Sequence, residues 1–363
     1  MDERAAMLRA IQLAWNGWAR VGSNPLVGAV VVKDGAVVGE GFHAEFGGPH
    51  GEAVALAAAG ERARGADLVA TLEPCRHHGK TPPCTEAILN AGIRRVVFGA
   101  HDVDPEAQGG AEVLRRGGVV VETGLLAEAV RRQNAVFFHR HAHRGRPFVA
   151  LKLAMSLDAR IADRDGRSRW VSGEEARDFV HWLRAGFEAI GVAAGTARAD
   201  DPALTVRGPL APRRPPLRVL FDRRADVPPT AQLLATARET PTVVVVGPEA
   251  GVAARAAATS AGAEVVVAED LAGALSALHA RGVASLLVEG GGILAGRLLA
   301  AGLVDRMYAI VAPVLLGAGG VPAFGALPGA TLESALRWPV SERRALGNDQ
   351  LLVLEGTRCS QAS

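Results

Sequence analysis

One histidine, one glutamate and two cysteines stand at spacings that could build a catalytic zinc site. His50 and Glu52 are separated by one residue, and Cys75 and Cys84 follow downstream. One imidazole and two thiolates supply three zinc ligands and leave a fourth position open for water, as catalytic zinc sites do. Such a site has no net charge, so a nearby carboxylate is needed to take the proton of that water. Glu52 is placed for this task and is not itself a ligand.

Taken alone, each cysteine is more often a buried thiol and the histidine a residue at the start of a helix. The combination of all four residues at these spacings favours a metal site. The pattern H-x-E, followed by Pro-Cys and a second Cys, is the signature of cytidine and nucleotide deaminases. Residues 73–84 (EPCRHHGKTPPC) resemble the deaminase half of the bifunctional riboflavin biosynthesis family, and Asn24–Gly28 (NPLVG) extends the resemblance. It implies a three-layer cytidine-deaminase-like domain that deaminates a phosphoribosylated diaminopyrimidine.

The loop between the two cysteines departs from the commonest deaminase pattern and carries positive charge. Eight residues intervene rather than two, and Arg76 stands where serine is usual, just as Gly51 stands where alanine is usual. With His77, His78 and Lys80, Arg76 is expected to form a cationic patch suited to a phosphate or a polar pyrimidine edge. The alternative is a merely solvent-exposed polar loop. The resemblance implies substrate contacts from Asn24, His77 and Lys80.

A run of three glycines in the C-terminal half follows an apolar strand and precedes an expected helix. The run is Gly290-Gly291-Gly292, between Leu287-Val288-Glu289 and Ile293-Leu294. Bare glycines let backbone amides approach a pyrophosphate, and a helix N-terminus stabilises its charge. No G-x-G-x-x-G motif joins an expected strand to a helix. The run alone leaves a plain tight turn as the alternative.

Four further segments resemble the reductase half of the same family: 151–158, 169–172, 196–207 and 288–291. The resemblance covers nearly all of residues 147–357 and implies a doubly wound fold similar to dihydrofolate reductase. One departure is Ala159, where glycine is usual. The resemblance implies that the nicotinamide cofactor is held by Ala154, Trp170, Thr196, Asp200, Asp222, Gly291, Gly292, Ile293, Leu294, Ala295, Gly296 and Arg297. It implies that the substrate is held by Ser168, Arg184, Leu204, Arg207 and Glu289.

Basic side chains suggest how the phosphates of substrate and cofactor are held. Arg184 and Arg207 suit the ribose 5-phosphate, because guanidinium groups match phosphate oxygens. Lys152, one of only three lysines, stands in an apolar strand, and we expect it to bind the sugar or the phosphate of the substrate. Arg223 and Arg224 could meet a 2′-phosphate and favour NADPH over NADH. The alternative is that both arginines are only solvated.

The N-terminal half alternates strands with helices, which predicts an α/β/α domain with a mainly parallel sheet. The first 20 residues are expected to form an amphipathic helix with Asp2 as its N-cap. His50 and Glu52 then lie at the start of a second helix, Cys75 follows a strand, and Cys84 begins another helix. Strands are expected at 27–32, 36–39, 67–72, 94–98 and 119–122, with helices at 50–60, 85–91 and 108–116.

The segment His139–Pro147 (HRHAHRGRP) is polar, basic and closed by a proline, which favours a linker over a metal or phosphate site. We therefore expect a deaminase domain at 1–145 and a reductase domain at 146–363. In the second half, Ser172–Glu175 matches a capping box that opens a helix reaching about Arg184. Strands are expected at 148–153, 189–194, 218–222, 242–246, 264–267, 285–289, 307–312 and 350–354.

Composition narrows the class of protein. A chain of 363 residues favours two domains. A net charge of +2 and an aromatic content of 4% speak against a nucleic-acid-binding face. No apolar run is long enough for a membrane span, and the charged N-terminus carries no signal peptide pattern. Three cysteines are too few for a disulfide framework, so a cytoplasmic enzyme is expected.

The resemblance thus implies a riboflavin biosynthesis enzyme with Zn²⁺ and NADPH as cofactors and a small phosphoribosylated pyrimidine as substrate. No nucleic acid or membrane partner is expected, and the sequence is compatible with a homo-oligomer. Two other functions are compatible with the motifs. One is a nucleotide deaminase whose C-terminal half is not catalytic. The other is a zinc-stabilised RNA-binding or editing-related module, which the near-zero net charge and the few aromatic residues disfavour.

Overall fold

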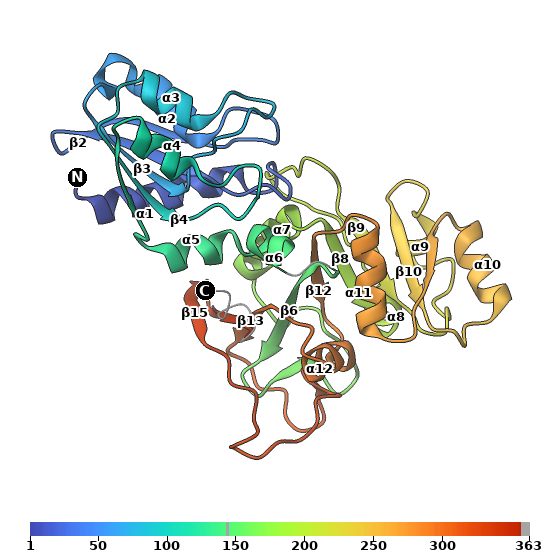
Figure 1. Cartoon of the computed structure of the whole chain (residues 1–363). Helices are drawn as coiled ribbons and strands as arrows, with labels where there is room; N and C mark the ends of the chain where they lie inside the picture. Colours follow the sequence, from blue (N-terminus) through green and yellow to red (C-terminus); the bar gives the residue numbers. More distant parts are fainter. Residues whose placement is uncertain (143–144, 357–363) are drawn as a thin grey trace. The chain divides into compact units, whose positions relative to one another are not determined.

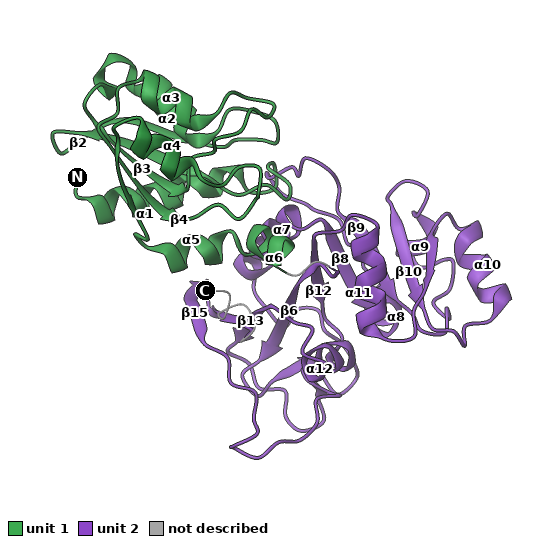
Figure 2. Ribbon diagram, viewed as in Figure 1, with its two compact units in different colours: residues 1–142 green, residues 143–363 purple. Residues whose placement is uncertain are grey.

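The computed structural model describes residues 1–142 and 145–356, and the chain divides into two compact units between Ala142 and His143 (Figure 2). Helix α6 (Ala135–Ala142) includes His139, whose side chain is buried. The expectation of a solvated linker over His139–Pro147 was therefore wrong for its first four residues. His143 and Arg144 lie outside the described residues. Within the described ranges, no helix has the length and apolar character needed to cross a membrane.

The first unit is built on a five-stranded sheet in the order β2-β1-β3-β4-β5. β1 runs antiparallel to both β2 and β3, whereas β3, β4 and β5 are parallel. The prediction of a mainly parallel sheet is wrong for β1. The hairpin reverses the chain between β1 and β2, and the crossover through helix α2 (Gly51–Ala59) makes β3 parallel to β2. The strands are β1 (Gly28–Lys33), β2 (Ala36–Phe42), β3 (Asp67–Leu72), β4 (Arg95–Ala100) and β5 (Val120–Thr123).

Helices cover both faces of this sheet, because its strands are apolar on both sides. Ala29 and Val31 of β1 pack into one core cluster, whereas Val30 between them packs into another. The first cluster is covered by α2 (Gly51–Ala59), α3 (Cys84–Asn90) and α4 (Gly110–Arg116) (Figure 1). The second is covered by α1 (Glu3–Ala14), α5 (Ala127–Gln133) and α6. The three-layer prediction is confirmed. The N-cap prediction is also confirmed, since Asp2 accepts a hydrogen bond from the Ala5 amide at 2.7 Å.

The second unit contains a nine-stranded sheet in the order β11-β10-β9-β8-β12-β6-β13-β16-β15. Neighbouring strands are parallel from β11 to β13, and the last two pairings, β13–β16 and β16–β15, are antiparallel. A small sheet pairs β7 (Arg160–Ala162) with β14 (Val321–Pro322). The nine strands are β6 (Phe148–Ser156), β8 (Ala189–Ala193), β9 (Leu217–Phe221), β10 (Thr242–Val246), β11 (Glu264–Val267), β12 (Ser285–Glu289), β13 (Arg306–Ala312), β15 (Val340–Leu346) and β16 (Asp349–Glu355).

Two core clusters lie on opposite faces of the parallel part of this sheet, which confirms a doubly wound fold. One cluster holds residues of α11 (Leu271–Ala280) and α12 (Gly292–Ala300) against β6, β9, β10 and β12. The other holds residues of α8 (Ala194–Asp200), α9 (Gln232–Ala235) and α10 (Val252–Ser260). The carboxyl ends of the parallel strands are therefore free to form a ligand site.

The capping-box prediction for the helix before β8 was wrong. Helix α7 (Glu174–Gly186) begins after Gly173, which is its N-cap, and no side chain caps its first turn. The Gly173 amide instead donates to Asp349 at 2.7 Å, so a carboxylate on a distant strand takes the place of the local cap. Arg184 lies in the last turn of α7, close to where the sequence placed the end of this helix.

The turn after β6 holds Ala159 in the left-handed region, with φ +58°, at the position where the family usually has glycine. An L-residue with a Cβ pays about 1–2 kcal/mol for this conformation. Glycine would avoid that cost but would gain entropy in the unfolded chain. We expect Ala159→Gly to raise the free energy of unfolding by up to about 1 kcal/mol. Calorimetric unfolding would measure it. Ala162→Gly, in β7, should destabilise, and equal destabilisation by both variants would contradict this account of the turn.

Candidate functional site

His50, Cys75 and Cys84 come together in the first unit, and their ligand atoms all lie within 4.8 Å of one another. His50 Nδ1 lies 3.4 Å from Cys75 Sγ and 3.3 Å from Cys84 Sγ. Zinc bonds of ordinary length in tetrahedral geometry would place nitrogen and sulfur about 3.6 Å apart. The three atoms therefore fit Zn²⁺ with little rearrangement.

Local secondary structure places each of these ligands. His50 is the N-cap residue of α2, Cys75 lies in the loop after β3, and Cys84 is the first residue of α3. The Cys84 amide donates to Cys75 Sγ at 3.4 Å. Hydrogen bonds from Cys84 and then His50 lower the pKa of the Cys75 thiol to about 4 despite its burial, while the hydrogen bond with Cys75 and burial raise the pKa of Cys84. One thiolate is thus favoured before a metal binds, and a cation would ionise the second.

Glu52 lies in the first turn of α2 with only 2% of its surface exposed. Its Oε2 atom is buried and has no hydrogen-bond partner within the described residues. Burial raises the pKa of this carboxyl to about 7. A divalent cation held by His50 would lower that pKa. A buried carboxylate oxygen without a partner, two residues from a metal ligand, can exchange a proton with a bound water.

Gly51, between His50 and Glu52, is the first residue of α2. A Cβ here would lie 2.9 Å from the Val27 carbonyl oxygen and 3.2 Å from the Phe42 Cα. Glycine lowers helix propensity relative to alanine, but at this position the neighbouring backbone leaves little room for a Cβ. Val27 also accepts a hydrogen bond from the His43 amide at 2.9 Å. The strand start at Gly28 thus runs directly past the start of α2.

Asn24 precedes this strand start by four residues. Its segment is fixed by Asn134, which accepts from the Leu26 amide at 2.7 Å and donates to the Leu26 carbonyl at 3.1 Å. The same segment passes the start of α2 at Val27. Asn24 therefore belongs to a segment that runs close to the ligand His50. Among the described residues, the Asn24 side chain forms no hydrogen bond with the candidate zinc ligands, so its substrate contact is a proposal.

Glu73 is a buried carboxylate for which the sequence suggested no role. Oε1 accepts from the amides of Gly109 and Ala111, and Oε2 accepts from the Asp102 amide and the His101 ring, all at 3.0–3.2 Å. A Cβ at Gly110 would lie 1.8 Å from the Pro74 carbonyl oxygen, so the start of α4 packs directly on this segment. Glu73 therefore fixes the chain that carries Cys75. The sequence signal that could have identified Glu73 is its position as an acidic residue directly after a buried strand.

The four cationic side chains of the loop between the cysteines have different surroundings. His78 pairs with Glu86 at 3.0 Å, and the Arg76 side chain lies against Gly109. His77 is half-buried, and its Nδ1 has no hydrogen-bond partner in the described ranges. The Lys80 ammonium lies 4.2 Å from the centroid of the Phe46 ring. A single role for all four side chains therefore does not follow from their contacts.

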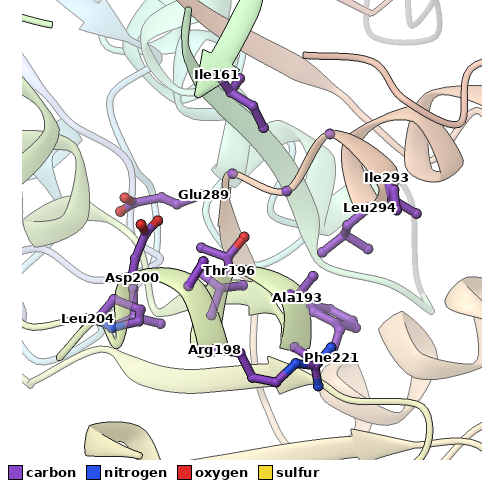
Figure 3. A pocket seen from close by; sticks show the side chains of 18 of the residues that line it. Ile161, Ala193, Thr196, Arg198, Asp200, Leu204, Phe221, Glu289, Ile293 and Leu294 are labelled. Atoms are coloured by element: carbon purple, nitrogen blue, oxygen red, sulfur yellow. The ribbon is translucent and has the colours of Figure 1, made fainter. Parts of the chain in front are cut away.

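In the second unit a cavity of about 1760 Å³ opens at the carboxyl ends of the parallel strands. Figure 3 shows Thr196 central in it, the carboxylates of Asp200 and Glu289 directed to one end, and Ile293 and Leu294 entering from α12. Ala295 and Gly296 do not line this cavity: Ala295 is in the core, and Gly296 packs against the backbone of Ala326. The remaining expected residues of both groups line it: Ala154, Trp170, Thr196, Asp200, Asp222, Gly291, Gly292, Ile293, Leu294, Arg297, Lys152, Ser168, Arg184, Leu204, Arg207 and Glu289.

The glycine run has a separate structural reason at each position. Gly290 and Gly291 have φ angles of +72° and +81°, which side chains rarely adopt. Gly291 is the N-cap of α12, and a Cβ there would lie 3.1 Å from Thr196 Oγ1. A Cβ at Gly292 would lie 2.2 Å from the Pro322 carbonyl oxygen. The run is therefore a tight turn, and it also opens a helix toward the cavity.

Arg184 and Glu289 form a buried two-pronged ion pair in this cavity. Arg184 Nε and Nη2 donate to the two Glu289 oxygens at 2.5 and 2.9 Å, and Nη1 donates to the Thr205 carbonyl at 3.0 Å. Burial alone would raise the pKa of Glu289, but Arg184 and Lys152 hold it below its usual range. Burial lowers the pKa of Lys152. The Arg184 guanidinium is thus already hydrogen-bonded to Glu289 and Thr205, which makes the expected binding of a phosphate by Arg184 less favourable.

The loop after α8 brings the other substrate candidates together. Ser168 donates to Asp200 Oδ1 at 2.7 Å, and Arg169 donates to the Asp200 carbonyl oxygen. Leu204 is buried with φ +49°, an unusual backbone conformation for leucine. The Arg207 amide donates to His181 at 3.1 Å, and within the described residues no carboxylate pairs with the Arg207 guanidinium. Arg207 is therefore better placed than Arg184 to receive a phosphate.

The side chains that the sequence assigned to the cofactor also differ in their contacts. Trp170 is 69% exposed, and the Arg177 guanidinium lies 4.6 Å from its ring centroid. Asp222 is buried and accepts from the Val227 amide at 2.8 Å, which shapes the turn that follows β9. Arg223 pairs with Glu249 and donates to the Glu269 carbonyl at 2.9 Å. No ion pair of Arg224 occurs in the part of the chain that the structure describes.

Two protein families match the chain, one in each half. Residues 1–100 match the cytidine and deoxycytidylate deaminase zinc-binding region, which contains all three candidate ligands. Residues 147–352 match the RibD C-terminal domain, which contains the cavity of the second unit. This match does not favour the alternative of a deaminase with a non-catalytic C-terminal half.

Whole proteins with both halves are also similar. The riboflavin biosynthesis protein RibD of Escherichia coli is 38% identical over 98% of this chain and 100% of its own length. That of Bacillus amyloliquefaciens is 40% identical over 87% of this chain and 85% of its own length. The first crystal form of Acinetobacter baumannii RibD is 35% identical, with a TM-score of 0.82 over 98% of this chain and 99% of that chain.

A Thermotoga maritima structure described as a diaminohydroxyphosphoribosylaminopyrimidine deaminase/5-amino-6-(5-phosphoribosylamino)uracil reductase is 34% identical, with a TM-score of 0.81 over 98% of both chains. The similarity therefore covers the deaminase half and the reductase half together. The chain belongs to the RibD family of bifunctional riboflavin biosynthesis enzymes, with a zinc-binding deaminase domain followed by an NADPH-using reductase domain.

Proposed function

We propose that residues 1–145 remove an amino group from 2,5-diamino-6-(5-phosphoribosylamino)pyrimidin-4-one, and that residues 146–363 reduce its ribosyl group to a ribityl chain with NADPH. The observation that carries the proposal is the convergence of His50, Cys75 and Cys84 beside the unpaired Glu52 carboxylate oxygen. A family fold alone does not show that a chain has kept its chemistry, whereas this set of side chains supports the proposal directly.

In the deaminase half, a zinc ion held by His50, Cys75 and Cys84 would activate a water molecule for attack on the pyrimidine. Glu52 takes a proton from that water and delivers it to the leaving amine. Water and the C–NH₂ group thereby become a C=O group and ammonia. We assign Asn24, His77 and Lys80 to the substrate, because the segments that carry them border the metal ligands.

In the reductase half, NADPH would supply a hydride to C1′ of the opened ribosyl group. We assign the 5-phosphate to Arg207, whose guanidinium is not engaged by a carboxylate in the described ranges. Arg184 orients Glu289, and Lys152 lies beside this pair in the neighbouring strand. Ser168 and Leu204 complete the substrate end, and Ala154, Trp170, Thr196, Asp200 and Asp222 belong to the cofactor end.

We assign the 2′-phosphate of NADPH to Arg224. It lines the cavity and has no ion pair among the described residues, whereas Arg223 is engaged by Glu249. Arg198, which also lines the cavity, is paired with Asp226 at 2.7 Å. Asp222 shapes the turn that presents Arg224. A free guanidinium can bind a phosphate without first breaking an ion pair.

The cofactor assignment is tested by Gly291→Asp. The substitution adds a side chain to a residue with φ +81°, close to Thr196, and puts a negative charge where the pyrophosphate is expected. We expect NADPH binding to weaken at least tenfold, about 1.4 kcal/mol, because the charge opposes the helix terminus. Zinc content and ammonia release should be unchanged. Cofactor titration followed by fluorescence measures the affinity.

Gly282→Asp is the matched control, because Gly282 has φ +84° and nothing within 4 Å of the added Cβ. It lies in the turn before β12, whereas Gly291 lies in the turn after this strand. Its NADPH affinity should match that of the unmodified chain. If Gly291→Asp also binds NADPH normally while it unfolds cooperatively, the glycines form only a turn and the cofactor lies elsewhere on the sheet.

We further propose that the enzyme works in the cytoplasm on a small phosphorylated substrate. Cys75 and Cys84 are free thiols, and a thiolate zinc site requires them reduced. Cys359, the third cysteine, lies outside the described residues. The relatives are proteins of riboflavin biosynthesis, which supports a small-molecule substrate over nucleic acid or membrane partners. A homo-oligomer remains compatible with the sequence.

A further inference from the structure

The segment between β2 and α2 is a fixed loop that leads into the ligand His50. Residues Glu45–Gly48 form a β-turn, in which the Gly48 amide donates to the Glu45 carbonyl at 3.0 Å. Gly47 has φ +85°, as the third residue of a type II turn requires. The Arg20 side chain pairs with Glu45 at 2.7 Å, and the Arg20 backbone carbonyl accepts a hydrogen bond from the Phe46 amide at 3.2 Å. The turn is therefore held from outside as well as by its own hydrogen bond.

Lys80 lies against this turn through both its stem and its charge. Its Nζ atom is 4.2 Å from the centroid of the Phe46 ring, within the range of a cation–π contact. A Cβ at Gly47 would lie 3.1 Å from Lys80 Cδ, so only glycine leaves full room for the stem. Phe46 is itself among the large apolar side chains that remain exposed. The contact joins the loop before His50 to the loop between Cys75 and Cys84.

An aromatic ring holds an ammonium group in a different way from a carboxylate. A carboxylate would neutralise the charge, whereas a ring face attracts the cation and leaves its charge available. Across the described residues, Lys80 forms no ion pair, although its neighbour His78 does pair with Glu86. The Lys80 ammonium is thus held in place and still able to bind a polar or anionic group.

We propose that Phe46 and Gly47 are positioning residues that hold the Lys80 side chain in place for the aminopyrimidine substrate of the deaminase. We call this contact of Phe46 and Gly47 with Lys80 the seat. This inference rests on the proposed assignment of Lys80 to the substrate. Phe46 acts through Lys80 and touches no reacting atom. The Arg20–Glu45 pair and the type II turn hold the seat itself in place.

The seat can be observed directly, because the whole chain contains only three lysines, Lys33, Lys80 and Lys152. In the zinc-loaded enzyme labelled with ¹³C at lysine Cε, ring current should move the Lys80 signal upfield, and Lys80→Met identifies that signal. Phe46→Leu should abolish the shift and lower deaminase kcat/KM about two- to fivefold, the fold-change that corresponds to an exposed cation–π contact. Phe46→Tyr should restore both. Zinc content and NADPH oxidation with the deaminated substrate should be constant throughout.

The outcomes separate this inference from the proposed function. If Lys80→Met deaminates at the normal rate, the assignment of Lys80 to the substrate fails, and the seat fails with it. If Lys80→Met loses activity but Phe46→Leu does not, the function stands and the seat is overturned. The seat is also overturned if no lysine signal is shifted by the ring, or if Phe46→Tyr is as impaired as Phe46→Leu.

Discussion

A Glu52→Gln enzyme is expected to bind its full complement of zinc and yet release ammonia about 10²–10⁴-fold more slowly than the unmodified chain. The amide has nearly the shape of the carboxylate, so the buried first turn of α2 should keep its packing. It cannot accept the proton of the attacking water, which Glu52 is positioned to take through its unpaired Oε2. Zinc analysis and an ammonia assay on the same preparation measure the two quantities.

The control for this prediction is a carboxylate on a neighbouring segment that has another task. Glu86 lies on α3 and pairs with His78 on the surface, so Glu86→Gln should leave ammonia release unchanged. The reductase half of Glu52→Gln should oxidise NADPH normally when it is given deaminated substrate. Ammonia release above a few per cent of normal in Glu52→Gln would refute the assignment of Glu52 as the proton carrier.

A Cys84→Ser enzyme is expected to contain well below one zinc ion per chain and to lose deamination in proportion. Cys84 Sγ lies 3.3 Å from His50 Nδ1 and is one of three ligand atoms, and a serine hydroxyl is a poor zinc ligand at neutral pH. Elemental analysis of the purified variant measures the metal. NADPH oxidation with deaminated substrate should persist, because the reductase residues lie in the other unit.

Cys359→Ser is the matched control, since it removes the one remaining cysteine of the chain and should leave the zinc content unchanged. The opposite pattern, in which Cys84→Ser keeps its zinc and Cys359→Ser loses it, would move the second thiolate ligand to Cys359. Equal retention by both variants would contradict a site with two thiolates.

Strands buried on both faces could be predicted well from the sequence. The runs at 67–72, 242–246 and 285–289 have the expected bounds, because strands covered by helices on both sides are almost continuously apolar. The edge strand at 264–267 also has the expected bounds, although it is only partly buried. β15 (VSERRAL) was not predicted, since it is polar and mostly exposed and is held by pairing with β16. The antiparallel pairing of β1 with β3 could not be predicted either, because it depends on which sheet edge the chain returns to.

The metal ligands could be predicted because their residue types and spacing are themselves the chemical signal. The contacts of the reductase site could not, since they depend on which strand ends meet. Arg184 was expected to clamp a phosphate, but it is engaged by Glu289, 105 residues away in the chain. Ala295 and Gly296 were included with their neighbours, although consecutive residues of a helix cannot all face one cavity. Glu73 and Phe46 act through distant contacts that no local pattern reveals.

The central claim, that one chain deaminates its substrate and then reduces the deaminated product, is tested most directly by one coupled assay. The enzyme is given the diaminopyrimidine phosphoribosyl substrate with NADPH, and ammonia release and NADPH oxidation are followed together. We expect ammonia to appear first and NADPH oxidation to follow until the two amounts are about equal. Ammonia release with no NADPH oxidation, from enzyme in which both units are folded, would contradict the account and leave only a deaminase.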